Sequence, residues 1–163
     1  MGKGSKHRSR RIPTLDNPDA CRDWLDRNKP RSMDVRQWDV WYAWLGSHPY
    51  SSVQEGERPV LIMSNDQNNR FSNTVTVVPF TTKMKKLELP AHVLVGRIDG
   101  WENSKTSMAL MEQMTTIDKR RLLSKVGEIT DPAVREKLTQ AVMMQLGINI
   151  NPESEERNEN IHM

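Results

Sequence analysis

Cysteine, long hydrophobic runs and clustered histidines are nearly absent from this sequence, and each absence excludes a class of protein. Cys21 is the one cysteine in 163 residues, so neither an internal disulfide framework nor a cysteine-based zinc site can form. No window approaches the roughly 20 apolar residues that a membrane-spanning helix needs. The basic start of the chain, residues 1–11, lacks the apolar stretch of a signal peptide. We therefore expect a cytoplasmic protein with no membrane segment.

The four histidines give no sign of a metal centre. No group of histidines and carboxylates recurs at metal-ligand spacing, so we expect no metal and no other cofactor. His92 follows Leu89-Pro90-Ala91 and is interpreted as structural. His48 lies in a polar loop, where a role in catalysis stays open.

Charge divides the chain into three segments. Residues 1–35 carry nine Lys/Arg against five Asp/Glu, residues 36–150 carry fourteen against twelve, and residues 151–163 carry one against four. We expect a basic N-terminal extension with a short helix that starts at Asn17-Pro18, then one folded domain, then an acidic flexible tail. The extension is either a phosphate-binding arm or a solvated terminus, and the sequence leaves both open.

Residues 36–150 have the pattern of a mainly β fold with one closing helix. Short apolar and β-branched runs alternate with polar segments such as Asn65–Asn69, which is predicted to be a turn. The predicted strands span residues 38–45, 59–64, 74–78, 92–95, 107–112 and 126–129, and residues 119–122 are predicted to form one helical turn. Asp131-Pro132 begins a helix that ends at Gly147. Short strands with hairpin-like connections and a closing helix favour a small, strongly bent barrel.

An arginine and a threonine lie at the ends of two of these predicted strands. Arg58 begins an apolar strand after a loop that can bend at Gly56, and Thr81 ends the next run of β-type residues. A guanidinium group is a permanent planar donor, and a hydroxyl can fill a remaining position around a phosphate. The sequence alone also allows a purely structural interpretation, in which Arg58 stabilises a strand end at the surface and Thr81 caps a loop.

Six short motifs follow one another in a fixed order between Arg36 and Ile148. They are Gln37–Leu45 with its Asp39-Val40 pair, Arg58–Leu61, Asn65–Ser72, Leu89–Val93, Glu112-Gln113 and Thr116–Lys119. In content and order they resemble the MazF/PemK/Kid family, the ribonuclease toxins of bacterial toxin–antitoxin pairs. The resemblance implies the SH3-like barrel of the MazF and CcdB type with a C-terminal helix, which agrees with the strand pattern.

The resemblance also implies an activity. Members of the family are sequence-specific, metal-independent endoribonucleases that cut single-stranded RNA, including mRNA, and so inhibit translation and growth. The ribose 2′-OH attacks the neighbouring phosphate and leaves 2′,3′-cyclic phosphate and 5′-OH ends. Arg58 and Thr81 match the family's catalytic positions, where they would stabilise charge on the phosphate. The expected partners are a second copy of the chain, in a homodimer, and a cognate antitoxin. For the antitoxin the resemblance favours a protein over an RNA.

Several further residues are predicted to bind RNA. Lys83, Lys85 and Lys86 form a basic loop directly after Thr81 and could track the phosphate backbone. The other predicted contacts are Gln54, Thr82, Glu112 and Gln113. Glu112 could be an auxiliary base, and a carboxylate paired with Arg58 would look the same in sequence. Trp101 is the aromatic residue with the best placement for base stacking.

The chain departs from the family pattern around its arginine. Glu55 and Glu57 flank Arg58 and could either weaken RNA binding by repulsion or hold the arginine in place. Thr115 stands where relatives often carry an arginine.

Two other functions stay open, a CcdB-like toxin that binds DNA gyrase without cutting and a non-catalytic RNA-binding barrel. Retention of Arg58 and Thr81 favours an enzyme, because a gyrase binder requires neither.

Overall fold

The computed structural model describes residues 19–20, 33–84, 86–102 and 104–149. The chain forms two compact units, Met1–Met33 and Asp34–Met163. In the first unit Asp19 and Ala20 are helical. The helix start at Asn17-Pro18, the basic arm and the acidic tail lie outside the described residues. The structure described below is that of the second unit.

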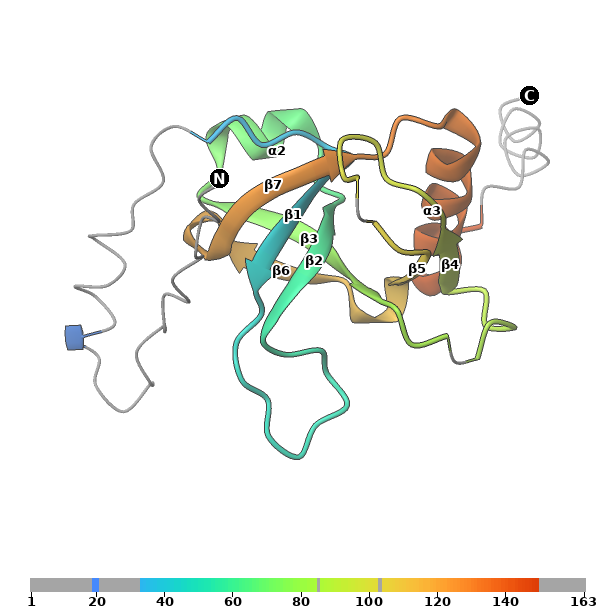
Figure 1. The fold of residues 1–163 in the computed structure, drawn as a ribbon, viewed down its shortest axis with the longest axis horizontal. Coiled ribbons are helices and arrows are strands. Elements are labelled where there is room, and N and C mark those ends of the chain that lie inside the picture. The colour runs from blue at the N-terminus through green and yellow to red at the C-terminus, as the bar shows by residue number, and fades with distance from the viewer. Residues whose placement is uncertain (1–18, 21–32, 85, 103, 150–163) are drawn as a thin grey trace, which may run out of the picture. The chain divides into compact units, whose positions relative to one another are not determined.

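The described part of the second unit contains seven strands, and every pairing between them is antiparallel. The strands are β1 (Asp39–Trp44), β2 (Glu57–Ile62), β3 (Thr74–Thr81), β4 (His92–Val95), β5 (Ser107–Leu110), β6 (Thr115–Asp118) and β7 (Leu122–Glu128). Their order in the sheet is β4-β5-β3-β2-β1-β7, and β6 also pairs with β3 (Figure 1). The expectation of a mainly β fold with a C-terminal helix is confirmed, and the sheet is strongly bent without closing into a complete barrel.

Strand β3 holds the sheet together because three strands, β2, β5 and β6, share its length. Its first half pairs with β6, from Thr74↔Asp118 to Val77↔Thr115. Its middle pairs with β2, and its end, Phe80-Thr81, pairs with β5. In its second half every residue from Val77 to Phe80 is buried, as expected where a strand is covered on both faces. β3 therefore connects the two parts of the sheet.

The helical segments lie between and after the strands. They are α2 (Asp66–Phe71), the 3-10 turns η1 (Met111–Gln113) and η2 (Lys119–Arg121), and α3 (Pro132–Gln145). Helix α3 starts as its sequence predicts, because the Asp131 side chain accepts a hydrogen bond from the Ala133 N–H at 2.9 Å and Pro132 takes the first helical position. The turn predicted at residues 119–122 is confirmed as η2.

Three elements differ from the sequence prediction, and one is η1, which takes the last two residues of the strand predicted at 107–112. The predicted turn Asn65–Asn69 is largely the helix α2, whose start is capped by the Asn65 side chain, 2.8 Å from the Asn68 N–H. Asn69 is buried, and its amide nitrogen donates to the Ser64 carbonyl at 2.8 Å. Strand β6 was not predicted, because Thr115–Asp118 is too short and polar to stand out before its pairing with β3 is known.

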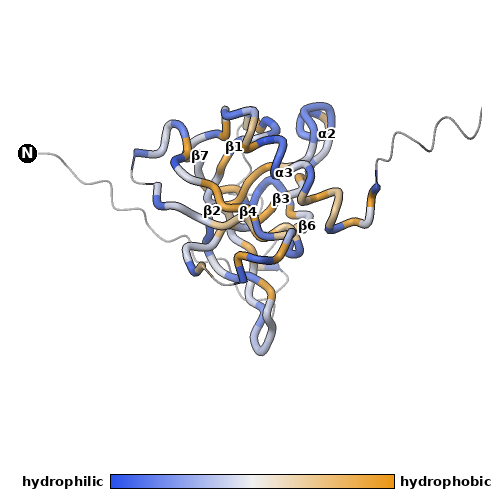
Figure 2. The backbone as a smooth tube through the Cα atoms, turned by 90° about the vertical axis from the view of Figure 1, so that its right-hand side faces the viewer, coloured by the Kyte–Doolittle hydropathy of each residue, from blue (hydrophilic) through white to orange (hydrophobic). Residues whose placement is uncertain are grey.

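The main core lies between the sheet and α3. It contains Val40, Leu61 and Phe80 from β1, β2 and β3, and Leu138 and Ala141 from α3. Figure 2 shows the apolar backbone segments running along the strands, while α2 and most loops are polar. Burying each such side chain stabilises the fold by about 1.5–3 kcal/mol. None of the helices in the described part is long and apolar enough to span a membrane.

The loop between β4 and β5 is attached to β7 by a pair of backbone hydrogen bonds. The Asp99 N–H donates to the Glu128 carbonyl at 3.2 Å, and the Glu128 N–H donates to the Asp99 carbonyl at 3.0 Å. This approach requires a glycine at position 127, because a Cβ there would lie 2.3 Å from the Asp99 carbonyl oxygen. The loop carries Trp101, so this attachment helps to fix one wall of the site described below.

We expect Gly127→Ala to lower the free energy of unfolding by about 1–3 kcal/mol, the usual cost of overpacking. The clash is with backbone, which cannot move aside as a flexible side chain can. Gly96→Ala is the matched control, since nothing lies within 4 Å of its added Cβ. Urea denaturation of both variants measures the difference. Equal stability of the two variants would show that the backbone contact between Asp99 and Glu128 does not require a glycine at position 127.

Candidate active site

A cavity of about 370 Å³ opens at the end of the β1–β2–β3 part of the sheet. Its walls come from β1, β2, β3, β5 and the β4–β5 loop. The lining residues are Tyr42, Glu57, Arg58, Pro59, Phe80, Thr81, Thr82, Trp101, Lys105 and Ser107. Arg58, Thr81 and Thr82, which were singled out from the sequence, therefore lie together in one cavity.

The register between β2 and β3 explains why these residues meet. Val60 pairs with Pro79 and Leu61 with Val78. Continued by two residues, this register sets Arg58 across from Thr81. Side chains alternate between the two faces of a strand, so Arg58 and Thr81 share one face at the strand ends. The arginine and the hydroxyl thus each lie two residues beyond the last β2–β3 pair, on the same side of neighbouring strands.

The contacts of Arg58 and Thr81 leave their donors available. The Arg58 Nε–H donates to the Glu55 carbonyl at 2.9 Å, which holds the guanidinium, while its terminal nitrogens have no partner among the described residues. The Thr81 Oγ1 accepts from the Lys83 N–H at 3.1 Å, so its hydroxyl hydrogen can be donated elsewhere. Together these groups offer the two terminal guanidinium nitrogens of Arg58 and one O–H as donors at the cavity, a set that suits a phosphate.

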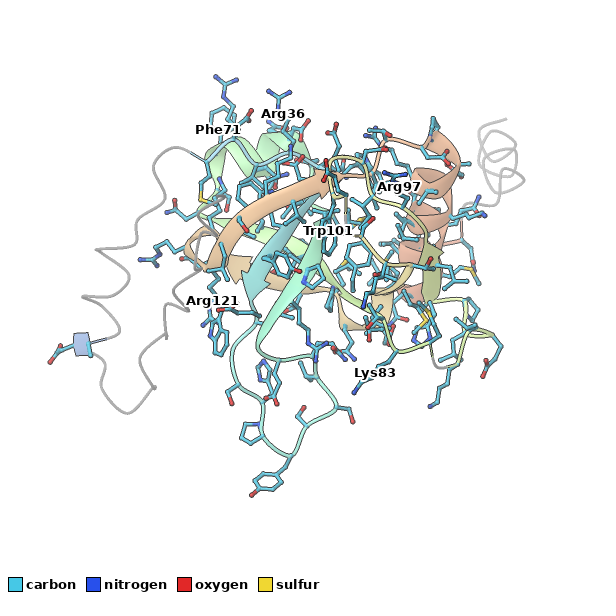
Figure 3. The ribbon with its side chains drawn as sticks, viewed as in Figure 1. Arg36, Phe71, Lys83, Arg97, Trp101 and Arg121 are labelled. Carbon is cyan, nitrogen blue, oxygen red and sulfur yellow. The ribbon has the colours of Figure 1, made fainter. Side chains whose placement is uncertain are left out.

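Aromatic and basic groups form the opposite wall. Trp101, labelled in Figure 3, meets the ring of Tyr42 edge to face, with 5.7 Å between the ring centroids. Lys105 lies further along the same loop, and Ser107 begins β5. The sequence analysis did not single out Lys105 or Ser107. The β4–β5 loop brings Lys105 to the site, and the pairing of β5 with the end of β3 brings Ser107. Both placements depend on tertiary structure, so no local signal could have identified these residues.

The loop between β1 and β2 is held in place by Gln113 of η1. The Gln113 Oε1 accepts from the Gln54 N–H at 2.7 Å, and its Nε2 donates to the Ser52 carbonyl at 3.2 Å. One carboxamide thereby bonds two backbone groups of a loop that lies about sixty residues earlier in the chain. The Gln54 side-chain oxygen is buried in the same region and has no hydrogen-bond partner within the described structure. Neither residue lines the cavity.

Glu112 lies outside the cavity and is bonded to His92. The Glu112 Oε1 is 2.9 Å from the His92 Nε2, and the His92 Nδ1 is 2.8 Å from the Lys86 carbonyl oxygen. A carbonyl oxygen only accepts, so Nδ1 carries a proton and donates it. The histidine side chain is 7% exposed and joins β4 to the lysine loop and to η1. The structure thus gives Glu112 a histidine, not Arg58, as its partner, and places His92 in a structural position.

The predicted lysine loop is only partly described. Lys83 is exposed and projects from the end of β3 (Figure 3). Lys86 is also exposed and adopts a positive φ of 52°. Lys85 lies outside the described residues. His48 does not reach the cavity, because its ring nitrogen Nε2 lies 3.1 Å from the Leu45 carbonyl within the β1–β2 loop.

Comparison with known proteins identifies the family. Residues 36–146 match the model of the PemK-like, MazF-like toxins of type II toxin–antitoxin systems. The chain belongs to this family. It is 38% identical over 117 residues to the endoribonuclease EndoA of Bacillus subtilis (strain 168), an alignment that covers 71% of this chain and 97% of that protein. The motifs that suggested the family from sequence all lie inside or directly beside the matched range.

Solved structures of the family share the fold. A mycobacterial endoribonuclease in complex with its cognate antitoxin superposes with a TM-score of 0.58 at 28% identity, over 72% of this chain and 99% of that one. MazF from Deinococcus radiodurans gives a TM-score of 0.59 at 17% identity, over 71% and 99% of the two chains, and this second likeness concerns the fold alone. The predicted fold type is therefore confirmed.

We expect Gln113→Ala to loosen the β1–β2 loop. The substitution removes two hydrogen bonds, each of which contributes about 1 kcal/mol, so the amide of Gln54 should exchange with solvent roughly 5- to 30-fold faster. Hydrogen exchange measured by mass spectrometry reports this change. Gln140→Ala on α3 is the control, because the Gln140 side chain bonds to Glu136 on the same exposed helix surface and to no other described residue. Unchanged exchange at Gln54 would show that Gln113 does not hold the loop.

Proposed function

We propose that this protein is a sequence-specific, metal-independent endoribonuclease toxin that cleaves single-stranded RNA, including mRNA, in the cytoplasm and thereby inhibits translation and growth. The observation that carries the proposal is the joint placement of Arg58 and Thr81 in one open cavity, in a chain that belongs to a toxin family with an endoribonuclease member 38% identical to it. The products are a 2′,3′-cyclic phosphate and a 5′-OH end.

The site supports this reaction without a metal-bound nucleophile, because the attacking oxygen is the 2′-OH of the RNA itself. The protein then has to neutralise the charge that develops on the phosphoryl oxygens in the transition state. The free terminal nitrogens of Arg58 supply charged donors for this purpose, and the Thr81 hydroxyl supplies a neutral donor. Thr82, the residue after β3, also lines the cavity and is proposed to contact the ribose or the next phosphate.

The remaining predicted RNA contacts divide into two groups. Lys83, Lys85 and Lys86 are proposed to bind the phosphate backbone beyond the cavity, which requires exposed cations and no base recognition. The second group, Gln54, Glu112 and Gln113, is proposed to set the shape of the RNA groove. Gln113 bonds to the β1–β2 loop at Gln54, and Glu112 bonds to His92. In this proposal these three residues influence RNA binding by holding the loops on both sides of the cavity.

We propose two protein partners. One is a second copy of the chain, with the RNA groove spanning the dimer interface, as the family resemblance implies. The other is a cognate antitoxin that covers the groove. A protein antitoxin is favoured because the family is defined by type II systems and because a similar mycobacterial endoribonuclease is known in complex with its cognate antitoxin.

We expect Arg58→Ala to lower kcat by about 10²–10³-fold, the usual cost of removing one donor to a developing oxyanion, and Thr81→Val to lower it less. The measurement is digestion of a long single-stranded RNA in EDTA, with mapping of the 5′ ends. Cleavage should recur at one short sequence and leave 5′-OH ends. Arg97→Ala is the control, because Arg97 is exposed and does not line the cavity. Full cleavage by Arg58→Ala, or none by the folded wild type, would overturn the proposal.

Lys83 should contribute to binding but not to base recognition. In the inactive Arg58→Ala background, Lys83→Gln should weaken RNA binding equally for all sequences and reduce the slope of log K against log salt by about 0.7, the value for one phosphate contact on a single strand. Fluorescence anisotropy across a salt series measures the slope. Lys137→Gln, on the exposed surface of α3, should leave it unchanged. An unaltered slope for Lys83→Gln would exclude a phosphate contact.

A further inference from the structure

The proposed reaction needs a group that accepts the proton of the 2′-OH, and neither residue at the centre of the site can do so. A guanidinium group stays protonated in proteins, and the hydroxyl of Thr81 is a poor base. General bases in ribose chemistry are carboxylates or neutral imidazoles within reach of the attacking hydroxyl. The described residues near the site offer His48, Glu55, Glu57, and the pair His92 and Glu112.

Four of these five groups are bonded elsewhere. The carboxylate of Glu55 accepts from the His48 N–H at 2.7 Å, and the His48 ring bonds to the Leu45 carbonyl, so both residues close the β1–β2 loop. His92 and Glu112 bond to each other at 2.9 Å. None of the four lines the cavity. Each has a structural contact that it would have to give up before acting on RNA.

Glu57 differs from these four groups because it lines the cavity and has no structural contact with the described residues to give up. It lines the cavity together with Arg58 and Thr81, and of the described lining residues it is the one with a carboxylate. Its side chain is exposed and has no hydrogen bond or ion pair with any described residue. The β2–β3 register, continued as above, sets it across from Thr82, one step along β2 from the Arg58 position. Side chains alternate along β2, so Glu57 leaves the other face of the strand from Arg58. The two residues meet at the strand end because both line the one cavity, where the Glu57 carboxylate can reach a ligand held by Arg58.

We propose that Glu57 is the general base of this site, an inference that rests on the proposed ribonuclease function. Glu57 takes the proton of the 2′-OH while the 2′-oxygen forms its bond to phosphorus. The bond between phosphorus and the 5′-oxygen breaks, and its electron pair stays on the 5′-oxygen, which takes a proton from a water molecule. The hydroxide left by that water then takes the proton from Glu57 and restores the carboxylate.

The charges around Glu57 make this role compatible with binding an anion. Arg58 on β2 and Lys105 from the β4–β5 loop line the same cavity. Its other polar lining residues are Tyr42, Thr81, Thr82, Trp101 and Ser107. Two cations therefore face one carboxylate before RNA arrives. The excess positive charge attracts the phosphate.

The test compares kcat and KM as a function of pH for the wild-type protein, Glu57→Gln and Glu57→Asp, on an RNA that contains one mapped cleavage site. Glu57→Gln should lower kcat by about 10²–10⁴-fold, the usual contribution of a general base, with KM nearly unchanged. The loss of kcat at the acid end of the wild-type profile should vanish in Glu57→Gln and persist in Glu57→Asp. Added formate should restore part of the activity of Glu57→Ala.

Two outcomes would overturn this inference. One is cleavage by Glu57→Gln at or above the wild-type rate, which would mean that the carboxylate only repels RNA. The other is a change in KM with the wild-type pH profile of kcat retained, which would mean that Glu57 only orients Arg58. Glu136→Gln on α3 serves as the matched control. The wild type and Arg58→Ala are run in parallel, because an inactive wild type would refute the ribonuclease function and not the choice of base.

Discussion

The pairing of β2 with β3 is the constraint on which the site depends. Because side chains alternate along a strand, a slip of one residue would send Arg58 and Thr81 to opposite faces. The register is fixed by Val60↔Pro79 and Leu61↔Val78, and these positions are buried in the core. The hydrophobic pattern that stabilises the fold therefore also sets the geometry of the reactive pair. No contact beyond the strand pairing is needed to bring Arg58 and Thr81 together.

Side chains, rather than regular backbone pairing, hold the loops around the site. The β1–β2 loop has no strand partner, so its backbone groups bond to Gln113, to the Glu55 carboxylate and to one another. The His92 side chain holds the lysine loop by a hydrogen bond to the Lys86 carbonyl. Both sets of contacts lead back to η1, the short turn that carries Glu112 and Gln113. This turn connects two loops that are far apart in the sequence.

The sequence predicted the parts of the structure that depend on local pattern. Apolar runs located five of the predicted strands to within a few residues, and the Asp131-Pro132 cap located α3. The polar helix α2 and the short strand β6 escaped prediction because their stability comes from tertiary contacts, such as the buried amide of Asn69. At the site, Arg58 and Thr81 could be found from strand ends and from the family resemblance. The contacts of Gln113 and the place of Lys105 depend on residues distant in the chain.

The two glutamates beside the arginine show why sequence alone could not assign their roles. Glu55 and Glu57 are two residues apart, so in a regular strand they would share a face. Gly56 lies between them with a φ of +77°, a conformation that side chains other than glycine rarely adopt. The backbone therefore turns at this point, Glu55 bonds back into the loop, and Glu57 begins the strand that lines the cavity. One glycine thus separates a structural carboxylate from one that is free to react.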